Sequence, residues 1–87
     1  MSTADLIRQR LAALEPETYT LEDESAQHKG HAGAASGGGH FRLTLVSSRF
    51  RNLSTLARHR LVYEAMGELM QREIHALSIT ALTPEEL

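Results

Sequence analysis

The chain has no cysteine and no tryptophan, and only four of its 87 residues are phenylalanine or tyrosine. The absence of cysteine excludes a disulfide framework, a cysteine-rich zinc finger, an all-cysteine iron–sulfur site and a thiol nucleophile. Any thiolate that the protein needs must therefore come from another molecule. A chain of this length forms one small domain.

Long apolar runs are absent as well, because no segment of the sequence approaches the ~18 apolar residues of a membrane span. The residues after Met1 carry neither the basic nor the apolar region of a signal peptide. We therefore expect a single domain over residues 1–87, located in the cytoplasm and without membrane association.

Charge is distributed unevenly along the chain, although the net charge is only −2. Between Ser25 and Tyr63 there are six basic residues and no acidic one, whereas the rest of the chain has three arginines and eleven acidic residues. A basic block of this kind either faces a partner or is spread over a solvated surface. Both interpretations are open from the sequence.

Two segments have the apolar spacing of helices. Residues 3–14 are preceded by Ser2, which forms a capping box with Asp5, and the helix is expected to end at Glu15-Pro16. Residues 55–72 predict one long helix with Ser54 as its N-cap. Its buried stripe is expected to comprise Leu61, Val62, Ala65, Met66, Leu69 and Met70. The tail from Thr83 to Glu86 predicts one further helical turn.

Three runs, residues 18–24, 40–47 and 75–82, alternate apolar and polar side chains and predict strands. Residues 26–39 include five glycines and predict a long loop between the first two strands. The order predicts an α+β fold, αββαβ, with two helices on one face of a three-stranded mixed sheet. The first two strands are expected to be antiparallel, and a right-handed crossover makes the third parallel to the second. The open face is expected to present Arg42, Thr44, Ser78 and Thr80 to water.

Histidine, in contrast to cysteine, is abundant, with five residues in the chain. His28 and His31 lie in the glycine-rich loop, and His75 lies at the start of the third strand. His40 has the parity of the open-face strand positions, and His59 lies in the long helix, so we expect structural roles for both. Because imidazole suits zinc and nickel, a labile ion of either metal at His28, His31 and His75 is chemically reasonable.

An enzyme is not indicated by the sequence. No Ser-His-acid set has a recognisable spacing, and no phosphate-binding loop is present. The pair Asp23-Glu24 is expected to cap a turn rather than to catalyse a reaction.

Short motifs follow one another between Ile7 and Glu86. They are Asp23-Glu24-Ser25, His28-x-x-His31, His40-Phe41-Arg42, Val46-Ser47-x-x-Phe50, Arg58-His59-Arg60-x-Val62-Tyr63, Ile74-His75-Ala76-Leu77-x-Ile79 and Thr83-Pro84-Glu85-Glu86. This succession, in its order and spacing, resembles the BolA family. One departure is Asn52, where the family usually has glycine in Phe-x-Gly-x-Ser. Asparagine is the next best residue at a positive φ, so we expect the turn to be kept.

The resemblance implies a fold like a class II KH domain and pairing with a monothiol glutaredoxin. The two proteins would share a [2Fe–2S] cluster for iron–sulfur trafficking or iron-dependent regulation. By similarity, His31 and His75 would be the ligands on this side, with His28 as an alternative to His31. A glutaredoxin cysteine and a glutathione thiol would hold the other iron. This division suits a cysteine-free chain, because histidine replaces cysteine on one iron of Rieske centres.

The alternative is DNA binding, since some BolA-like proteins are described as transcriptional regulators that bind DNA. Arg49, Arg51, Arg58 and Arg60 would then contact phosphates from the turn and the start of the long helix. KH domains, however, hold the backbone with a GxxG loop between helices, and the Gly-x-x-Gly of this chain lies at residues 30–33, in the glycine-rich loop. The same arginines would also suit an acidic glutaredoxin surface or the carboxylates of glutathione. We therefore rank DNA binding second.

Overall fold

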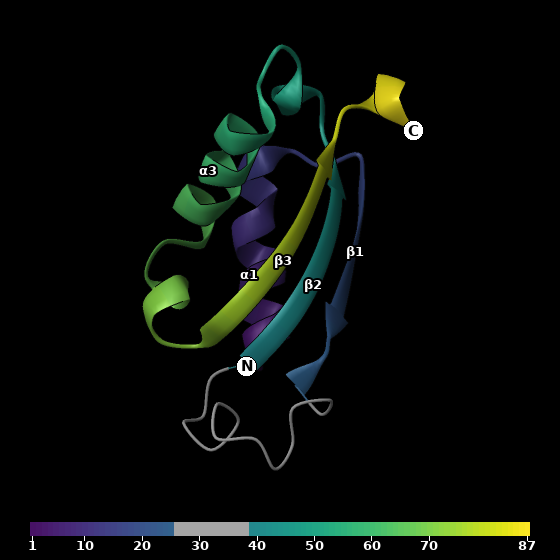
Figure 1. The fold of residues 1–87 in the computed structure, drawn as a ribbon. Coiled ribbons are helices and arrows are strands. Elements are labelled where there is room, and N and C mark those ends of the chain that lie inside the picture. The colour runs from purple at the N-terminus through teal and green to yellow at the C-terminus, as the bar shows by residue number, and fades with distance from the viewer. Residues whose placement is uncertain (26–38) are drawn as a thin grey trace.

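A computed structural model describes residues 1–25 and 39–87, and its elements follow the predicted αββαβ order (Figure 1). The helices are α1 (Thr3–Leu11) and α3 (Thr55–Met66), and the strands are β1 (Thr18–Asp23), β2 (Gly39–Val46) and β3 (Ile74–Leu82). Four short 3₁₀ turns complete the described elements: η1 (Ala12–Leu14), η3 (Ser48–Phe50), η4 (Gly67–Gln71) and η5 (Pro84–Glu86).

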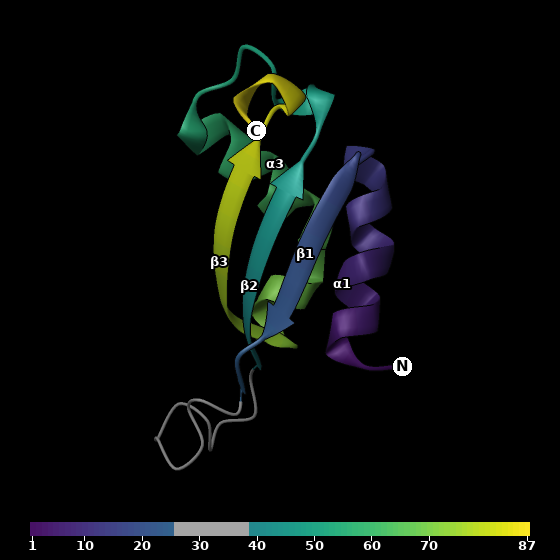
Figure 2. The ribbon, with the colours of Figure 1, turned by 90° about the vertical axis from the view of Figure 1, so that its right-hand side faces the viewer.

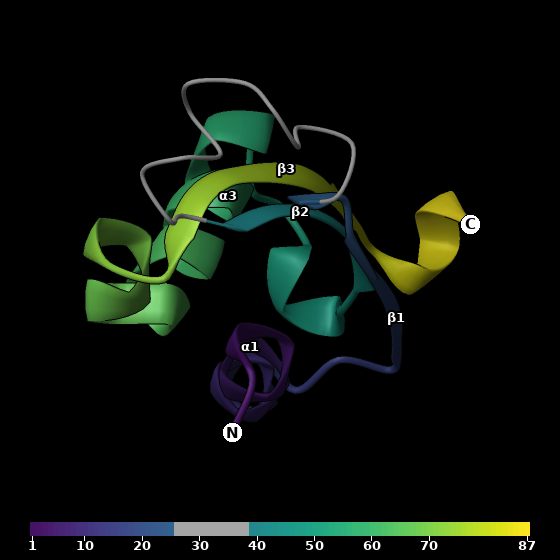
Figure 3. The same cartoon turned by 90° about the horizontal axis from the view of Figure 1, so that it is seen from below.

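The sheet has the order β1-β2-β3, with β1 and β2 antiparallel and β2 and β3 parallel, as the sequence predicts. Both helices lie behind the sheet, on one of its faces (Figure 2), and the sheet curves around α1 (Figure 3). The other face presents the predicted polar side chains, since Arg42, Ser78 and Thr80 are exposed and Thr44 is half-buried. The predicted fold class, an α+β domain with a three-stranded mixed sheet, is confirmed.

The hydrophobic core lies between the sheet and the two helices. Leu43 and Leu45 of β2 are fully buried, because β2 is the central strand. The other residues with no exposed surface in this core are Ile7, Leu11, Phe50, Val62 and Met66. Neither helix within residues 1–25 and 39–87 has the length and hydropathy needed to cross a bilayer.

The prediction of one long helix over residues 55–72 is wrong at its C-terminal end. The α-helix ends at Met66, and Gly67 has a φ of +56°, a left-handed conformation that glycine adopts at little cost. The chain then continues as the 3₁₀ turn η4. Arg10 of α1 donates a hydrogen bond to the Met66 carbonyl at 3.5 Å, so the end of α3 is tied to the other helix.

Two other turn positions have a positive φ. Asn52 has a φ of 64°, which confirms that asparagine keeps a turn for which the BolA family usually has glycine. Glu15, before Pro16, has a φ of 48° and leaves the right-handed helical region, so α1 and η1 end where predicted. The predicted loop over 26–39 lies outside the described residues except for Gly39, which is the first residue of β2.

Candidate functional site

Three strand ends meet at one end of the sheet, where β1 ends and where β2 and β3 begin (Figure 2). The backbone is fixed there by hydrogen bonds between segments that are distant in sequence. The Gly39 N–H donates to the Glu73 carbonyl at 3.0 Å, and the Glu24 N–H donates to the His40 carbonyl at 2.8 Å. The His40 N–H in turn donates to Ser25 Oγ at 3.0 Å. Both backbone groups of His40 are therefore held in place.

Asp23 and Glu24 support this end of the sheet. The Ser25 N–H donates to Asp23 Oδ1 at 2.9 Å, and hydrogen bonds from Ser25 hold the pKa of Asp23 below its usual value. Glu24 lies 3.3 Å from the Arg42 guanidinium. Asp23 is thus engaged in the turn after β1, as the sequence predicts for this pair.

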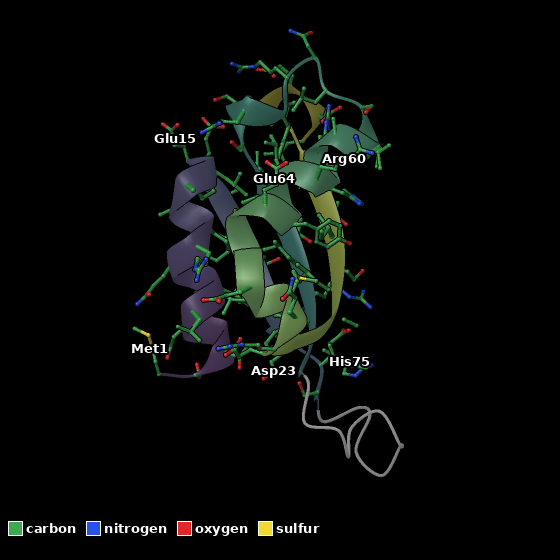
Figure 4. The ribbon with its side chains drawn as sticks, turned by 90° about the vertical axis from the view of Figure 1, so that its left-hand side faces the viewer. Met1, Glu15, Asp23, Arg60, Glu64 and His75 are labelled. Carbon is green, nitrogen blue, oxygen red and sulfur yellow. The ribbon has the colours of Figure 1, made fainter. Side chains whose placement is uncertain are left out.

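His75 lies at a bulge in the pairing of β2 with β3. Gly39 pairs with Ile74 and His40 pairs with Ala76, so His75 is the extra residue on β3. A bulge redirects the side chain of its extra residue, and bulges are common beside functional sites. His75 is exposed and lies at the same end of the molecule as Asp23 (Figure 4).

The bulge brings a second histidine to His75. The ring of His40, which is half-buried, lies 4.9 Å from the ring of His75 between centroids, with 43° between the ring planes. The sequence analysis did not predict this contact. Two imidazole groups therefore meet where the three strand ends meet.

The remaining histidines have different placements. His28 and His31 lie outside the described residues, so their pairing with His75 stays a prediction. His59 is half-buried on α3, one residue from Arg60, which lies at the end of the molecule opposite His75 (Figure 4). In the part of the chain that the structure describes, no three histidine or acidic side chains gather in a way that would hold a metal ion.

Two of the four predicted phosphate-binding arginines form ion pairs with the C-terminal turn η5. Arg51 donates two hydrogen bonds to Glu85, at 2.9 and 2.5 Å. Arg58 donates to the carboxylate of Glu86 at 2.6 and 3.3 Å. The Arg58 side chain is only 13% exposed, and it also donates to the carbonyls of Leu53 and Ala81, each at 3.0 Å.

These ion pairs lower the pKa of both glutamates. The hydrogen bonds from Arg58, followed by that from the Thr83 backbone, lower the pKa of Glu86 to about 2. The hydrogen bonds from Arg51 hold the pKa of Glu85 below its usual value. Both carboxylates therefore stay ionised, and their ion pairs stay formed, at neutral pH.

Arg49 and Arg60, the other two predicted arginines, differ in whether they contact a carboxylate among the described residues. Arg49 donates to the Ala13 carbonyl at 3.0 Å and lies 3.5 Å from the Glu15 carboxylate. Arg60 is exposed and, of the four arginines, is the one without a carboxylate partner among residues 1–25 and 39–87. The sequence holds a signal for the contacts of Arg51 and Arg58 with η5, because Glu85 and Glu86 belong to the acidic remainder of a chain whose central segment has no acidic residue.

Comparisons with known proteins agree with this architecture. A family model described as BolA-like protein matches residues 11–86. "BolA-like protein 1" of Mus musculus is 48% identical over 74 residues, which cover 85% of this chain and 52% of that protein. "DNA-binding transcriptional regulator BolA" of Haemophilus influenzae is 33% identical over 87 residues, covering 99% of this chain and 82% of that protein.

A solved structure, the BolA domain of SufE1 from Arabidopsis thaliana, superimposes with a TM-score of 0.86 at 40% identity, and the match covers 100% of this chain and 98% of that one. The chain spans about half the length of the mammalian relatives it matches, 52% of the mouse protein and 53% of the Bos taurus protein. The family model covers most of the chain, and the sequence relatives and the structural neighbour agree with it. The chain belongs to the BolA-like protein family.

Proposed function

We propose that this chain is a non-enzymatic adaptor that pairs with a monothiol glutaredoxin in the cytoplasm and supplies imidazole ligands to a [2Fe–2S] cluster shared by the two proteins. Its role would be iron–sulfur trafficking or iron-dependent regulation. The observation that carries the proposal is the exposed His75, set on a bulge at the end of the sheet. The chain has no cysteine, so imidazole is the only nitrogen or sulfur ligand of the usual iron–sulfur kind that it can supply.

The donor set suits one half of such a cluster. Imidazole in place of thiolate on one iron raises the reduction potential, as in Rieske centres. His75 is one ligand in this proposal, and the family resemblance gives His31 as the second, with His28 as its alternative. The remaining iron would be held by the glutaredoxin cysteine and by glutathione.

The architecture favours presentation of His75 to a partner. The strand ends around it are fixed by hydrogen bonds between segments, so the backbone that carries the ligand is ordered before a partner arrives. The His75 side chain is exposed, so another protein can reach it without displacing any core residue. A donor on a fixed backbone loses less conformational entropy on binding than a donor on a flexible one.

The test is a titration of the chain with a cluster-loaded monothiol glutaredoxin and glutathione, followed by visible circular dichroism. The wild-type chain should produce a new cluster spectrum, and His75→Ala should leave the spectrum of the glutaredoxin unchanged. His59→Ala, which changes a half-buried histidine on α3, serves as the matched control and should behave like the wild type. A His75→Ala spectrum identical to that of the wild-type mixture rules out His75 as a ligand.

DNA binding is the second candidate, and the names of two relatives favour it. "DNA-binding transcriptional regulator BolA" proteins of Haemophilus influenzae and Vibrio cholerae are 33% and 37% identical to this chain. Against it, Arg49, Arg51 and Arg58 are engaged with carbonyl and carboxylate groups of the chain itself. Phosphate contacts make affinity fall with salt, so a binding constant independent of salt concentration excludes this candidate.

A further inference from the structure

We propose that the outer edge of β3 pairs with the same edge of a second copy of this chain, so that two three-stranded sheets join into one. The pairing goes beyond the proposed function and does not depend on it, because it uses neither a metal nor a glutaredoxin. In the sheet formed by residues 1–25 and 39–87, β3 has a neighbouring strand on one side only (Figure 2). An edge strand exposes backbone N–H and C=O groups with which another strand can pair.

The two edges of the sheet differ in the features that prevent such pairing. Edge strands of natural proteins are protected by short length, by charged side chains and by proline. The edge strand β1 has six residues, ends with Glu22 and Asp23, and begins two residues after Pro16. β3 has nine residues, and none of them is proline, aspartate, glutamate, lysine or arginine. The edge of β3 is therefore the one that can accept another strand.

A second copy of β3 is the occupant that fits this edge. An edge without charged side chains offers no ion pair to a charged strand, whereas two copies of it meet without like-charge repulsion. Among the described strands only β3 lacks acidic residues, lysine and arginine, because β1 has Glu22 and Asp23 and β2 has Arg42. Two identical edges that meet about a two-fold axis also form a closed dimer.

Two hydrogen bonds show which backbone groups of β3 point outward. The Leu82 carbonyl accepts a bond of 2.9 Å from the N–H of the residue that follows β2, so it points toward β2. The Ala81 carbonyl points the other way and accepts a bond of 3.0 Å from the Arg58 guanidinium. Because backbone groups alternate in direction along a strand, those of Leu77 and Ile79 point outward as well.

The Arg58 hydrogen bond also selects the register of the dimer. A two-fold axis at Ile79 would pair Leu77 with Ala81, whose carbonyl is already occupied. An axis at Ser78 instead pairs Leu77 of one copy with Ile79 of the other, so that both outward residues exchange hydrogen bonds in an antiparallel ladder. The two Ser78 side chains then face each other across the axis, on the open face of the joined sheet.

α3 adds an apolar surface beside this edge. It contacts β3 and lies behind it, whereas α1 lies behind β1 (Figure 2). Leu56 and Tyr63, two helical turns apart on one face of α3, are 62% and 42% exposed. The other large hydrophobic side chains exposed in the described parts of the chain are Met1 and Leu87, its first and last residues. Opposite residues of an antiparallel pair share a face, so the dimer places both α3 helices on the same face of the joined sheet.

The experiment is sedimentation equilibrium of the whole chain over a series of concentrations. A short ladder and two helix side chains form an interface of the transient class, below about 1,200 Å², so the wild type should be a mixture of monomer and dimer. Ser78→Lys places like charges opposite each other in the non-hydrogen-bonded pair and should weaken dimerisation about fivefold. Thr20→Lys, an equally exposed position on the open face of β1, is the matched control and should dimerise like the wild type.

A mixture of two variants tests the two-fold axis. Ser78→Lys and Ser78→Glu should each be mostly monomeric, and their equimolar mixture should dimerise at least as well as the wild type, because opposite charges then meet across the axis. A mixture no more dimeric than either variant alone overturns the pairing, and so does undiminished dimerisation of Ser78→Lys. A wild type that stays monomeric into the millimolar range also overturns it and leaves the edge of β3 to a strand of another protein.

Amide hydrogen exchange of the wild type gives a second readout that needs no variant. The outward N–H groups of Leu77 and Ile79 should exchange more slowly as the protein concentration rises. Those of Ser78 and Thr80, which point toward β2, should exchange at a rate that does not depend on concentration. Exchange at Leu77 and Ile79 that is equally independent of concentration overturns the proposal.

Discussion

Arg58 is the basic residue whose replacement distinguishes a structural arginine from a phosphate-binding one. Its side chain is 13% exposed, and its guanidinium donates to the carbonyls of Leu53 and Ala81, as well as to Glu86. The perturbation is Arg58→Met, which keeps much of the side-chain length and removes every donor. The Glu86 side chain is 44% exposed and solvent screens its ion pair, so the energetic estimate rests on the two carbonyl bonds.

Hydrogen bonds that involve a charged group contribute about 1.5–3 kcal/mol each, and the lower value is appropriate near the surface. Loss of the two carbonyl bonds should therefore lower the free energy of unfolding by about 3 kcal/mol. For a domain of this size such a loss corresponds to a fall in Tm of about 12–24 °C. Urea unfolding followed by far-UV circular dichroism measures the change.

Arg60→Met is the matched control. Arg60 is exposed and lies two residues along the same helix, so its replacement should change stability by no more than about 0.5 kcal/mol. Equal stability of Arg58→Met and Arg60→Met would refute the structural role of Arg58. If the role holds, a loss of DNA affinity in an Arg58 variant reports unfolding as well as lost phosphate contact, and Arg60 is the better probe of DNA binding.

Three further predictions concern the turn at Asn52, the start of β2 and the C-terminal segment. Asn52 has a φ of 64°, so Asn52→Ala should lower the free energy of unfolding in urea by about 1 kcal/mol, while Asn52→Gly stays near the wild type. A glycine variant less stable than the alanine variant contradicts this. A Cβ on Gly39 would lie 2.5 Å from Phe41 Cε2, so Gly39→Ala should lower the free energy of unfolding by about 1–3 kcal/mol in the same assay. An unchanged urea midpoint would mean that the Phe41 ring moves aside freely. The pKa of Glu86 is lowered from 4.5 to about 2, so its contribution to stability is present above pH 4.5 and is lost as the pH falls toward 2. Glu86→Gln should remove that part of the acid dependence in a series of thermal melts, and an unchanged pH profile contradicts the ion pair.

Local patterns predicted most of the fold. Alternation located all three strands, and the capping boxes and Pro16 located the ends of α1 and the C-terminal turn. The break at Gly67 was missed, because apolar spacing continues through Leu69 and Met70 into η4. A single glycine inside a periodic pattern does not by itself show whether the helix continues through it.

The candidate site was less predictable, because its geometry depends on contacts between distant segments. His40 contacts His75 beside a one-residue shift in the register of β2 and β3, and alternation contains no information about such a bulge. Arg51 reaches Glu85 across 34 positions in the sequence, and only the charge balance of the two segments hinted at that contact. The assignment of His31 as a ligand still comes from the family resemblance alone.

The central claim is that this chain and a monothiol glutaredoxin hold one [2Fe–2S] cluster between them through His75. Sedimentation velocity, detected at a visible wavelength that only the cluster absorbs, measures the claim most directly. The account predicts that with the wild-type chain the coloured species has the mass of a complex containing both proteins, and that with His75→Ala the colour sediments without this chain. Two results would contradict this account. One is colour that sediments without the wild-type chain. The other is colour that still sediments as a complex of both proteins when His75→Ala replaces the wild-type chain.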